Sequence, residues 1–370
     1  MKNQINQLVI EWKDVELRNL GELIMGQSPK GNSYNNEKKG IPLLNGAADF
    51  KYNQIMPKQF TTQPTKISRK GDLLFCIRAT IGKTIISDGV YCLGRGVAGF
   101  RVNEDLLKKE FLLKILDNKL KNLVLQGSTI MGVKGKDIES IKIPLPFLNG
   151  QPDLETQKAI VSILEKAEQL KEKRKQAIKL LDEYVKSTFN EMFMGKGFEI
   201  KGFFDVVNTT TGKLDSNAME KDGKYPFFTC SQETFKINNY AFDCEALLLS
   251  GNNAAGRYSV KYYKGKFNAY QRTYILTLKE KGDFRYIHFV LTNKLEELQR
   301  KSIGTNTKYL TLGILKSLKI PHPPLPLQQT FASMVEHVEK LKEKQNQSLK
   351  EIEQLFNALM QKAFNGELVR

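Results

Sequence analysis

The sequence is poor in the residue types on which metal and thiol chemistry depends. Its 370 residues include only four cysteines and three histidines. The cysteines lack any C-x-x-C spacing and the histidines do not cluster with them, so the ligand pattern of a tetrahedral zinc site is missing. We expect buried free thiols and no metal ligands. The positions are Cys76, Cys92, Cys230, Cys244, His288, His322 and His337.

Signatures of secretion, membrane insertion and catalysis are also missing. No apolar stretch approaches the roughly 18 residues of a membrane span, so we expect a cytoplasmic chain with no membrane partner. We find no G-x-x-x-x-G-K-[ST] phosphate loop, no N-P-P-[FY] tetrapeptide of amino-methyltransferases and no Gly-rich cofactor turn. The stretch PDLETQK (152–158) resembles a PD-(D/E)xK nuclease motif only superficially, because Asp153 suits a helix N-cap better. We expect no catalytic residue and no cofactor in this chain.

Positive charge is in excess, and it is unevenly distributed. The chain has 57 Lys and Arg against 40 Asp and Glu, a net charge of +17. Residues 1–150 carry 23 basic and 14 acidic side chains and residues 195–327 carry 20 and 12, whereas residues 151–194 and 328–370 are neutral. A lysine-rich coding bias would have made all four segments basic. The distribution favours two modules that face the phosphates of DNA, separated by neutral segments.

These segments form a duplicated unit. SIKIP (140–144) recurs as SLKIP (317–321), a shift of 177 residues, and LKEK (170–173) recurs at 341–344, a shift of 171. A fainter match pairs GDLLFCIRATIGK (71–83) with EALLLSGNNAAGR (245–257). We expect a first arm at residues 1–150 and its long helix at 151–195, then a second arm at 196–327 and its helix at 328–370.

Both helical segments carry an apolar stripe. Between Leu154 and Phe193 apolar residues recur at spacings of three and four, and the second copy repeats them from Phe331 to Ala363. The stripe predicts helices of about 40 residues, or roughly 60 Å, which are too long to bury one face in a single arm. We expect the two helices to pack on each other, antiparallel and with pseudo-twofold symmetry. Both stripes are interrupted at polar segments, 171–176 and 342–347.

The two arms read as mixed α/β domains, which makes the chain α+β overall. Short β-rich runs are broken by Gly, Asn and Lys-Gly turns, and a helix is expected near 104–122 and near 283–301. The run YSVKYYKGKF (258–267) is expected to form a hairpin turning at Lys264-Gly265 rather than a stacking platform for bases. Seven of the twelve prolines lie between an arm and its helix, where we expect them to end the last strand and set the direction of the helix.

Polar, glycine-rich loops in both arms can hydrogen-bond to phosphates or base edges, although turns favour the same residues for structural reasons. Arginine suits guanine, and asparagine or glutamine suits adenine. The candidate DNA-binding residues of the first arm are Ser28, Lys30, Asn32, Tyr34, Asn45, Arg78, Thr80, Lys83 and Lys134, the last in the loop 127–136. Those of the second arm are Ser231, Gln232, Asn252, Asn253, Arg257, Gln271, Arg272, Asn306 and Lys308.

Taken together, several stretches resemble the specificity subunits of type I restriction–modification enzymes. They are KGDLLFCIRATIGK (70–83), SIKIPLP (140–146), YKGKFNAYQRTYIL (263–276), SLKIPHPPLPLQQ (317–329) and LMQKAFNGELV (359–369). Each stretch is short, but their order, with two target-recognition domains each followed by a long helix, is specific and covers essentially the whole chain.

The resemblance implies that each arm reads one half of a bipartite site in double-stranded DNA and that the helices set the gap. It implies two modification subunits, which bind S-adenosylmethionine, and restriction/translocase subunits, which use ATP and Mg²⁺. Because the two arms diverge in sequence, we expect an asymmetric site. A tandem DNA-binding regulator or architectural protein without a methyltransferase partner remains the alternative. A specificity subunit of a related type II enzyme is not separated from a type I subunit by the sequence.

Overall fold

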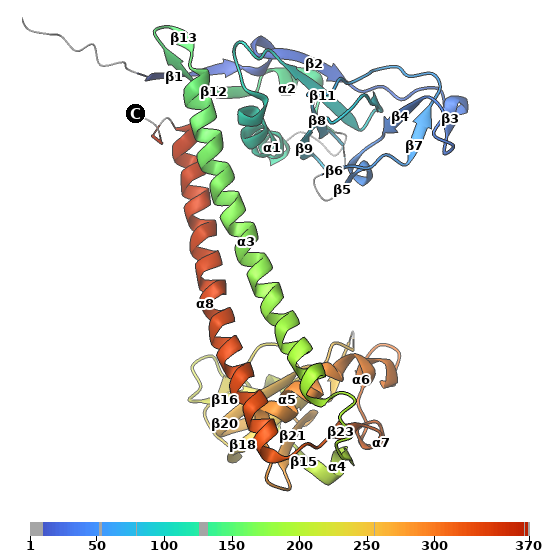
Figure 1. Ribbon diagram of the computed structural model, residues 1–370, viewed down its shortest axis with the longest axis vertical. Helices are drawn as coiled ribbons and strands as arrows, with labels where there is room; N and C mark the ends of the chain where they lie inside the picture. Colours follow the sequence, from blue (N-terminus) through green and yellow to red (C-terminus); the bar gives the residue numbers. More distant parts are fainter. Residues whose placement is uncertain are drawn as a thin grey trace, which may run out of the picture. The chain divides into compact units, whose positions relative to one another are not determined.

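The computed structural model describes residues 10–51, 54–78, 80–125, 132–254, 256–365 and 367–368. The chain divides into two compact units, the first made of Met1–Lys173 with Leu349–Arg370 and the second of Arg174–Ser348. Each unit contains one arm, part of helix α3 (Leu154–Phe193) and part of helix α8 (Leu325–Phe364) (Figure 1). The duplicated arrangement expected from the sequence is therefore present twice.

Both long helices have 40 residues, and their starts are chemically defined. Asp153 caps α3, because its carboxylate accepts hydrogen bonds from the backbone N–H groups of Glu155 (3.1 Å) and Thr156 (3.0 Å). Glu155 points outward and pairs with Lys158 at 2.7 Å. The prediction that Asp153 is a helix cap is confirmed. In the second copy Pro324 precedes α8, and its carbonyl accepts the N–H groups of Leu327 and Gln328.

The two long helices pack antiparallel in each unit. In the first unit Ile160 and Leu164, near the start of α3, share a core with Ala363, near the end of α8. In the second unit the end of α3 meets the start of α8, where the ring of Phe189 lies 5.5 Å from that of Phe331. The polar segments also meet, since the Arg174 guanidinium donates to the side-chain oxygen of Gln345, its counterpart 171 residues on, at 2.7 Å. The expected antiparallel pairing is confirmed.

The first arm is a sheet with both faces buried. The antiparallel strand order is β2 (Gly21–Met25), β11 (Val97–Val102), β8 (Leu73–Cys76) and β9 (Gly82–Ile86). Leu73 and Phe75 face helix α1 (Lys109–Leu125) and the long helices, while Leu74 and Cys76 face a second sheet. That second sheet has the order β10 (Cys92–Leu93), β4 (Ile41–Leu44), β7 (Gln59–Thr61) and β3 (Tyr34–Asn35).

The second arm repeats this layering in one continuous sheet. Its strand order is β15 (Val207–Thr211), β21 (Thr273–Leu278), β18 (Phe242–Ser250), β20 (Val260–Ala269), β16 (Tyr225–Phe228) and β17 (Phe235–Ile237). Leu247 and Leu249 face α5 (Phe284–Asn293) and the long helices, whereas Ala246 and Leu248 face the opposite core. The alternation has the period of two that is expected when both faces of a strand are buried.

Two sequence-based expectations about the second arm are wrong. Residues 258–267 do not form a hairpin at Lys264-Gly265, because β20 runs straight through both residues and Gly265 pairs with Cys244 of β18. Pairing with β18 along almost its whole length holds this segment extended despite its turn-like Lys-Gly pair. The helix expected near 283–301 is interrupted at Lys294 into α5 and α6 (Leu295–Lys301). In the first arm α1 begins at Lys109 rather than near residue 104.

The proline-rich segments differ between the copies. In the second copy β23 (Lys319–Pro321) ends at Pro321, as expected. In the first copy β12 (Lys142–Leu148) runs through Pro144 and Pro146, so the expectation that these prolines end the strand is wrong. They are tolerated because residues two apart point their backbone nitrogens to the same edge, and β12 can pair with β1 (Ile10–Glu16) through the residues between them. The short hairpin partner of β12 is β13 (Gln151–Pro152), and that of β23 is β14 (Ile200–Gly202).

Smaller elements complete both arms. The first arm adds α2 (Gly135–Glu139), β5 (Phe50–Lys51), β6 (Gln54–Ile55), η1 (Leu17–Asn19), η2 (Gly31–Ser33) and η3 (Ala47–Asp49). The second arm adds α4 (Phe203–Val206), α7 (Leu312–Lys316), η4 (Ser216–Ala218), β19 (Asn252–Asn253) and β22 (Lys308–Tyr309). Helices α2 and α7 lie at the same place in the two copies, 177 residues apart.

The thiols are free, but only two are buried. Cys76 and Cys92 lie in the core of the first arm, whereas Cys230 and Cys244 are half-buried. Burial raises the pKa of the Cys76 thiol to about 11, which makes it a poor nucleophile. Within the described ranges, no three His, Cys, Asp or Glu side chains are grouped so that they could hold a metal ion. No helix in these ranges combines the length and apolar character needed to cross a membrane.

Candidate nucleic-acid interface

Five backbone hydrogen bonds join separate loops of the first arm into one edge, which we call the first rim: residues 26–28, 44–47, 77–78, 94–97 and 132–134. The bonds run from Gly26 N–H to Val97 O (3.1 Å), Gln27 N–H to Leu93 O (2.8 Å), Gly94 N–H to Leu44 O (2.8 Å), Ile77 N–H to Gly96 O (3.0 Å) and Val133 N–H to Ile77 O (3.1 Å). Loops distant in the sequence are thus fixed side by side. Residues 127–131 of the expected loop 127–136 lie outside the described residues.

The second arm has the same bonds at equivalent positions, which define the second rim: residues 212–214, 228–232, 251–253, 270–273 and 309–311. They run from Gly212 N–H to Thr273 O (3.4 Å), Tyr270 N–H to Phe228 O (2.9 Å), Gly251 N–H to Arg272 O (2.8 Å) and Leu310 N–H to Gly251 O (2.8 Å). They place Ile77 opposite Gly251 and Val133 opposite Leu310, which are the sequence shifts of 174 and 177. The duplication therefore extends to individual hydrogen bonds.

Close backbone approach explains a glycine at the same place in both rims. A Cβ on Gly26 would lie 2.2 Å from the carbonyl oxygen of Gly94. A Cβ on Gly212 would lie 1.9 Å from the carbonyl oxygen of Ala269. Neither distance is possible for a side chain, so the two arms need glycine there in order to bring their loops together.

The first rim exposes three polar side chains of different origin. Asn45 follows β4 and donates to the Gln59 side chain at 3.0 Å. Its loop is held by the buried carboxylate of Asp49, which accepts the N–H of Asn45 at 2.8 Å. Arg78 follows β8, and Arg95 occupies the turn between β10 and β11, where its N–H approaches the Ser28 hydroxyl at 3.4 Å. Asn45, Arg78 and Arg95 thus lie on loops that are hydrogen-bonded to one another.

The other candidates of the first arm are more scattered. Lys30 and Asn32 are exposed at η2, and Tyr34 lies in β3, the edge strand of the second sheet. Thr80 and Lys83 are exposed on the chain that leads from the rim to β9, and the Lys83 ammonium reaches the carbonyl oxygen of Ala47 at 3.4 Å. Lys134 is exposed just before α2, at the end of the rim.

The second rim brings its candidates closer together. Asn252 and Asn253 form β19, which pairs with Tyr309 and Lys308 of β22. The Arg272 guanidinium lies 5.9 Å from the centre of the Tyr309 ring, a distance typical of a cation–π contact. The exposed Arg257 follows the same turn, since its N–H donates to the Asn253 side chain at 3.1 Å.

A half-buried lysine supports the neighbouring loop of this rim. The Lys261 ammonium donates to the carbonyl oxygens of Ser231 (2.9 Å) and Glu233 (2.6 Å), and burial lowers its pKa. This contact fixes Ser231 and leaves Gln232 exposed. Gln271 is exposed and donates to Asp215 at 2.8 Å. Asn306 is exposed on the turn before β22.

Sequence reasoning missed three residues of these rims. Arg95 and Tyr309 are exposed at the rims but were not among the candidates, and Lys261 supports a rim from below. Arg95 could have been found by extending the repeat, because the hydrogen bonds place it opposite the candidate Gln271 at a shift of 176. Tyr309 lies in the candidate loop 303–309. No sequence signal identifies Lys261, since its role depends on the fold of the loop above it.

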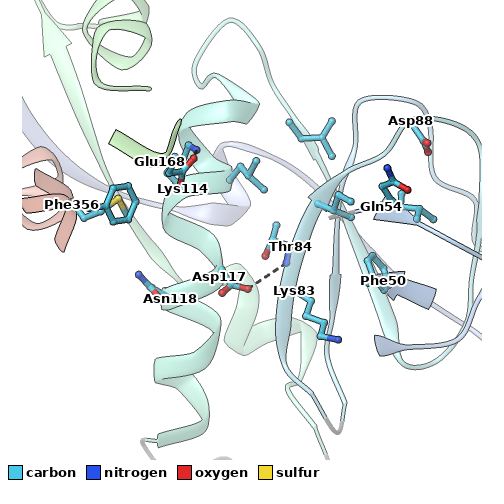
Figure 2. Close-up of a pocket in the computed structure, with 15 residues that line it drawn as sticks. Phe50, Gln54, Lys83, Thr84, Asp88, Lys114, Asp117, Asn118, Glu168 and Phe356 are labelled. Carbon is cyan, nitrogen blue, oxygen red and sulfur yellow. Dashed lines mark hydrogen bonds and ion pairs between the residues drawn. The ribbon is translucent and has the colours of Figure 1, made fainter. Parts of the chain in front are cut away.

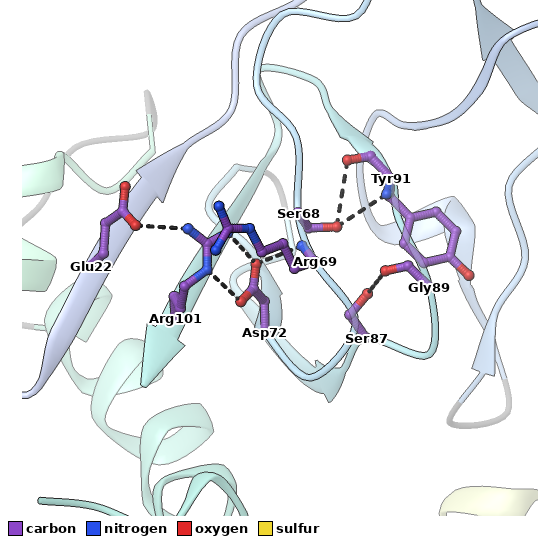
Figure 3. Close-up of polar contacts among 8 residues, drawn as sticks. All are labelled: Glu22, Ser68, Arg69, Asp72, Ser87, Gly89, Tyr91 and Arg101. Carbon is purple, nitrogen blue, oxygen red and sulfur yellow. Dashed lines mark hydrogen bonds and ion pairs between the residues drawn. The ribbon is translucent and has the colours of Figure 1, made fainter. Parts of the chain in front are cut away.

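The first arm also contains a polar network at the entrance to β8 (Figure 3). The buried carboxylate of Asp72 accepts two hydrogen bonds from the Arg101 guanidinium, at 3.1 and 3.0 Å, and one from the Arg69 N–H at 2.7 Å. The remaining nitrogen of Arg101 pairs with Glu22 at 2.7 Å. The shifts of 174 and 176 place Ala246 and Thr277 at the corresponding positions of the second arm, so this network belongs to the first arm alone.

Comparisons with known proteins agree with the repeated architecture. The specificity subunit of the type I restriction enzyme EcoDI of Escherichia coli is 35% identical over 172 residues, which cover 45% of this chain and 37% of that protein. The putative MjaX specificity subunit of Methanocaldococcus jannaschii is 34% identical over 200 residues, 53% of this chain and 45% of the relative. The chain thus spans less than half the length of these two relatives. The MjaIX specificity subunit of the same organism aligns at 22% identity over 99% of this chain and 96% of its own.

Two solved structures share the fold. The S subunit of a type I restriction-modification system from M. genitalium superposes with a TM-score of 0.60 at 15% identity, covering 98% of both chains. A chain from a structural study of complex assembly and conformational transition in a type I R-M system gives a TM-score of 0.65 at 19% identity, covering 98% of this chain and 100% of that one. The family model described as the type I restriction modification DNA specificity domain matches residues 10–180 and again residues 196–354. Because the model accounts for both arms and most of both long helices, the chain belongs to the type I restriction–modification DNA specificity family.

Proposed function

We propose that this chain is a non-catalytic subunit whose two arms each read one half of an asymmetric, bipartite DNA site. The observation that supports this most is that both rims share one hydrogen-bonded backbone frame but display different side chains. Arg78 of the first rim corresponds to Asn252 of the second, and Arg95 corresponds to Gln271. Arginine favours guanine whereas asparagine and glutamine favour adenine, so one frame would read two different half-sites.

The charge distribution supports contact between the arms and DNA. Both rims belong to the basic parts of the chain, and the long helices are neutral. Lysine and arginine that face phosphates supply the sequence-independent part of the affinity, while the rim side chains would select bases. Such a chain would act where the DNA of the cell lies, in agreement with the expected cytoplasmic location.

The long helices would set the distance between the half-sites and carry the partner subunits. Their equal length of 40 residues and their antiparallel pairing suit a spacer with pseudo-twofold symmetry. Each helix also exposes a large apolar side chain at the same position, Tyr184 on α3 (54% exposed) and Leu355 on α8 (56%). Two equivalent apolar positions fit two copies of one partner, here the modification subunits. These subunits and the restriction/translocase subunits would supply S-adenosylmethionine chemistry and ATP- and Mg²⁺-dependent cleavage.

Exchange of the first arm tests the proposal. Replacing residues 1–150 by the corresponding arm of another family member should change one half-site and leave the other intact, when methylated sites are mapped in a host that also makes the partner subunits. A change in both halves, or in neither, would contradict separate reading.

An insertion in the polar centre of the helix pair tests the spacer. Four residues added after Lys175, about one turn or roughly 6 Å, should keep both half-sites and lengthen the unspecified gap by one or two base pairs at roughly 3.4 Å each. An unchanged gap at full activity would show that the helices do not measure it.

A tandem DNA-binding regulator is the alternative that the charge distribution also allows. Co-purification distinguishes the two, because a specificity subunit should capture a methyltransferase that carries the N-P-P-[FY] tetrapeptide. A chain that binds a bipartite site tightly but captures no such subunit would favour the regulator.

A further inference from the structure

A buried glutamine joins each arm to its long helix. Gln157 in the first turn of α3 is 0% exposed; its side-chain oxygen accepts the N–H of Lys108 at 2.8 Å and its nitrogen donates to the carbonyl oxygen of Leu106 at 3.2 Å. Gln328 in α8 is 1% exposed and accepts the N–H of Asp283 at 3.1 Å. Lys108 and Asp283 directly precede α1 and α5. Each glutamine therefore holds the N-terminal end of the helix by which its arm packs on the helix pair.

A glutamate eleven residues further along each long helix provides a second attachment. Eleven residues are about three turns, so the glutamate lies on the same face as the glutamine. Glu168 of α3 accepts from the Lys114 ammonium at 2.5 Å, and its counterpart Glu339 of α8 pairs with the Arg285 guanidinium at 3.0 Å. We call the contacts between each arm and the long helices the first and the second junction.

The first junction contains a cavity of about 790 Å³ (Figure 2). One side is formed by Lys114 and Asp117 of α1, another by Thr84 of β9, and a third by Glu168, Phe356 and Met360 of the long helices. The cavity lies beside the middle of α1. The N-terminal part of α1 is packed more fully, with the rings of Phe111 and Phe364 5.4 Å apart.

Aromatic rings occupy the corresponding positions of the second junction. The shifts of 175 and 171 place Phe289 opposite Lys114, and Phe189 opposite Met360. The rings of Phe189 and Phe289 lie 5.0 Å apart, and each also contacts the ring of Phe331. A smaller pocket of about 500 Å³ adjoins this cluster, toward the end of α3 and β14. The interlocked rings leave α5 less freedom against the long helices than α1 has.

We propose that Gln157 and Gln328 are positioning residues that fix each arm on its long helix, and that the first arm turns about Gln157 into the space of its cavity while the second arm is held by its aromatic cluster. A hydrogen-bonded amide keeps the start of α1 in place but resists a small rotation only weakly. Packing would resist that rotation, and at the first junction packing is incomplete on one side of α1. The proposal concerns the mechanics of the arms and does not depend on what they bind.

Matched pairs of spin labels on the full-length chain test the proposal. One pair joins Lys58 of the first arm to Lys166 of α3, and the other joins Thr234 of the second arm to His337 of α8. All four positions are exposed, and the two pairs occupy equivalent places in the two units. The half-buried Cys230 and Cys244 are first replaced by serine. Pulsed electron spin resonance should give a broader distance distribution for the first pair than for the second.

Filling the cavity should remove this difference. Lys114→Phe and Met360→Phe each introduce the residue that the second arm carries at that position, and the first distribution should narrow to the width of the second. Met360→Phe keeps the Lys114–Glu168 ion pair, so it separates filling from loss of charge. Equal widths in the unmodified chain, or a first distribution that neither variant narrows, would overturn the proposal.

Loss of the amide tests the positioning role directly. Gln157→Met keeps the length of the side chain but removes both hydrogen bonds, so it should shift and broaden the first distribution, with circular dichroism showing that the chain remains folded. Gln328→Met should alter the second distribution less, because the aromatic cluster still holds that arm. If Gln157→Met left the first distribution unchanged, Gln157 would have no positioning role.

Discussion

The two arms have the same backbone frame but are stabilised differently. The first arm holds β8 with the buried Asp72–Arg101 pair and rests on a junction with a polar-lined cavity. The second arm lacks that pair and instead packs Phe189, Phe289 and Phe331 together. Because the frame is maintained by backbone hydrogen bonds and glycines, the side chains beneath it can diverge without changing how loops reach the rim. Reading and stability can therefore change separately in each arm.

The largest expected effect is on the first arm alone. Asp72→Asn leaves the Arg101 guanidinium partly buried without its charge partner, and we expect the first unit to lose about 3 to 5 kcal/mol of unfolding free energy. Trp12, the single tryptophan, lies in β1, so urea unfolding followed by its fluorescence reports on this unit. The control Glu22→Gln removes an ion pair whose carboxylate is 66% exposed and should cost less than about 1 kcal/mol. Equal losses from the two variants would show that burial of the Asp72 pair is unimportant.

The next effect contrasts the two junctions. Phe189→Ala removes a ring that contacts several others and should destabilise the second unit by about 3 kcal/mol. Met360→Ala, at the equivalent position beside the cavity, should cost the first unit about 1 kcal/mol, because fewer contacts are lost there. Hydrogen exchange of amides in β18 and β8 measures the two units separately. A loss for Met360→Ala as large as that for Phe189→Ala would contradict the difference in packing.

A smaller effect tests whether the two arms contact DNA alike. Lys83→Glu and Arg257→Glu reverse charge at equivalent positions, and each should weaken DNA binding by about tenfold and lower the slope of affinity against salt by about one. Lys175→Glu, at an exposed position of the neutral α3, is the matched control and should change affinity less. Equal losses at all three positions would refute the assignment of DNA contacts to the arms.

The smallest expected effect is on the pH dependence of the second unit. Burial, helped by the nearby Lys201, lowers the pKa of His322 below its ordinary value of 6.5, so the folded chain holds this imidazole neutral. The unfolded chain binds the proton more readily, and the second unit should therefore lose stability as the pH falls below 6.5. Leu145 occupies this place in the first copy, so the first unit should lack this contribution. His322→Gln should flatten the pH profile of urea unfolding, whereas His337→Gln on the exposed face of α8 should not. A profile that His322→Gln leaves unchanged would show that this histidine does not contribute.

Much of the fold could be predicted because it depends on local patterns and on the repeat. The apolar stripe predicted helix α3 over the range Leu154–Phe193 that it has in the structure. The shift between SIKIP and SLKIP holds for individual hydrogen bonds, since Leu17 and Phe203 donate to Ile141 and Leu318. Local pattern failed where tertiary pairing overrides turn propensity, as at Gly265 in the middle of β20.

The candidate DNA-binding residues were predictable by type but not by arrangement. Glycine and polar residues correctly indicated the loops around Asn45, Arg78, Asn252 and Arg272. Arg95 was missed because a single arginine between two glycines has no meaning until β10 and β11 bring it beside Ser28. Lys261 was interpreted as part of a turn, whereas it lies in a strand and supports the loop of Ser231.

The sequence by itself determined the duplication, the two amphipathic helices, the neutral spacer and the basic arms, because periodicity and net charge are properties of neighbouring residues. Only the tertiary structure decided which loops form the rims, how the glutamines of the two long helices reach the arms, and which junction contains a cavity. The first two depend on hydrogen bonds between residues far apart in the chain. The last depends on how well side chains from three or four separate elements fill one space, as Lys114 and Met360 do on one side and Phe289 and Phe189 on the other.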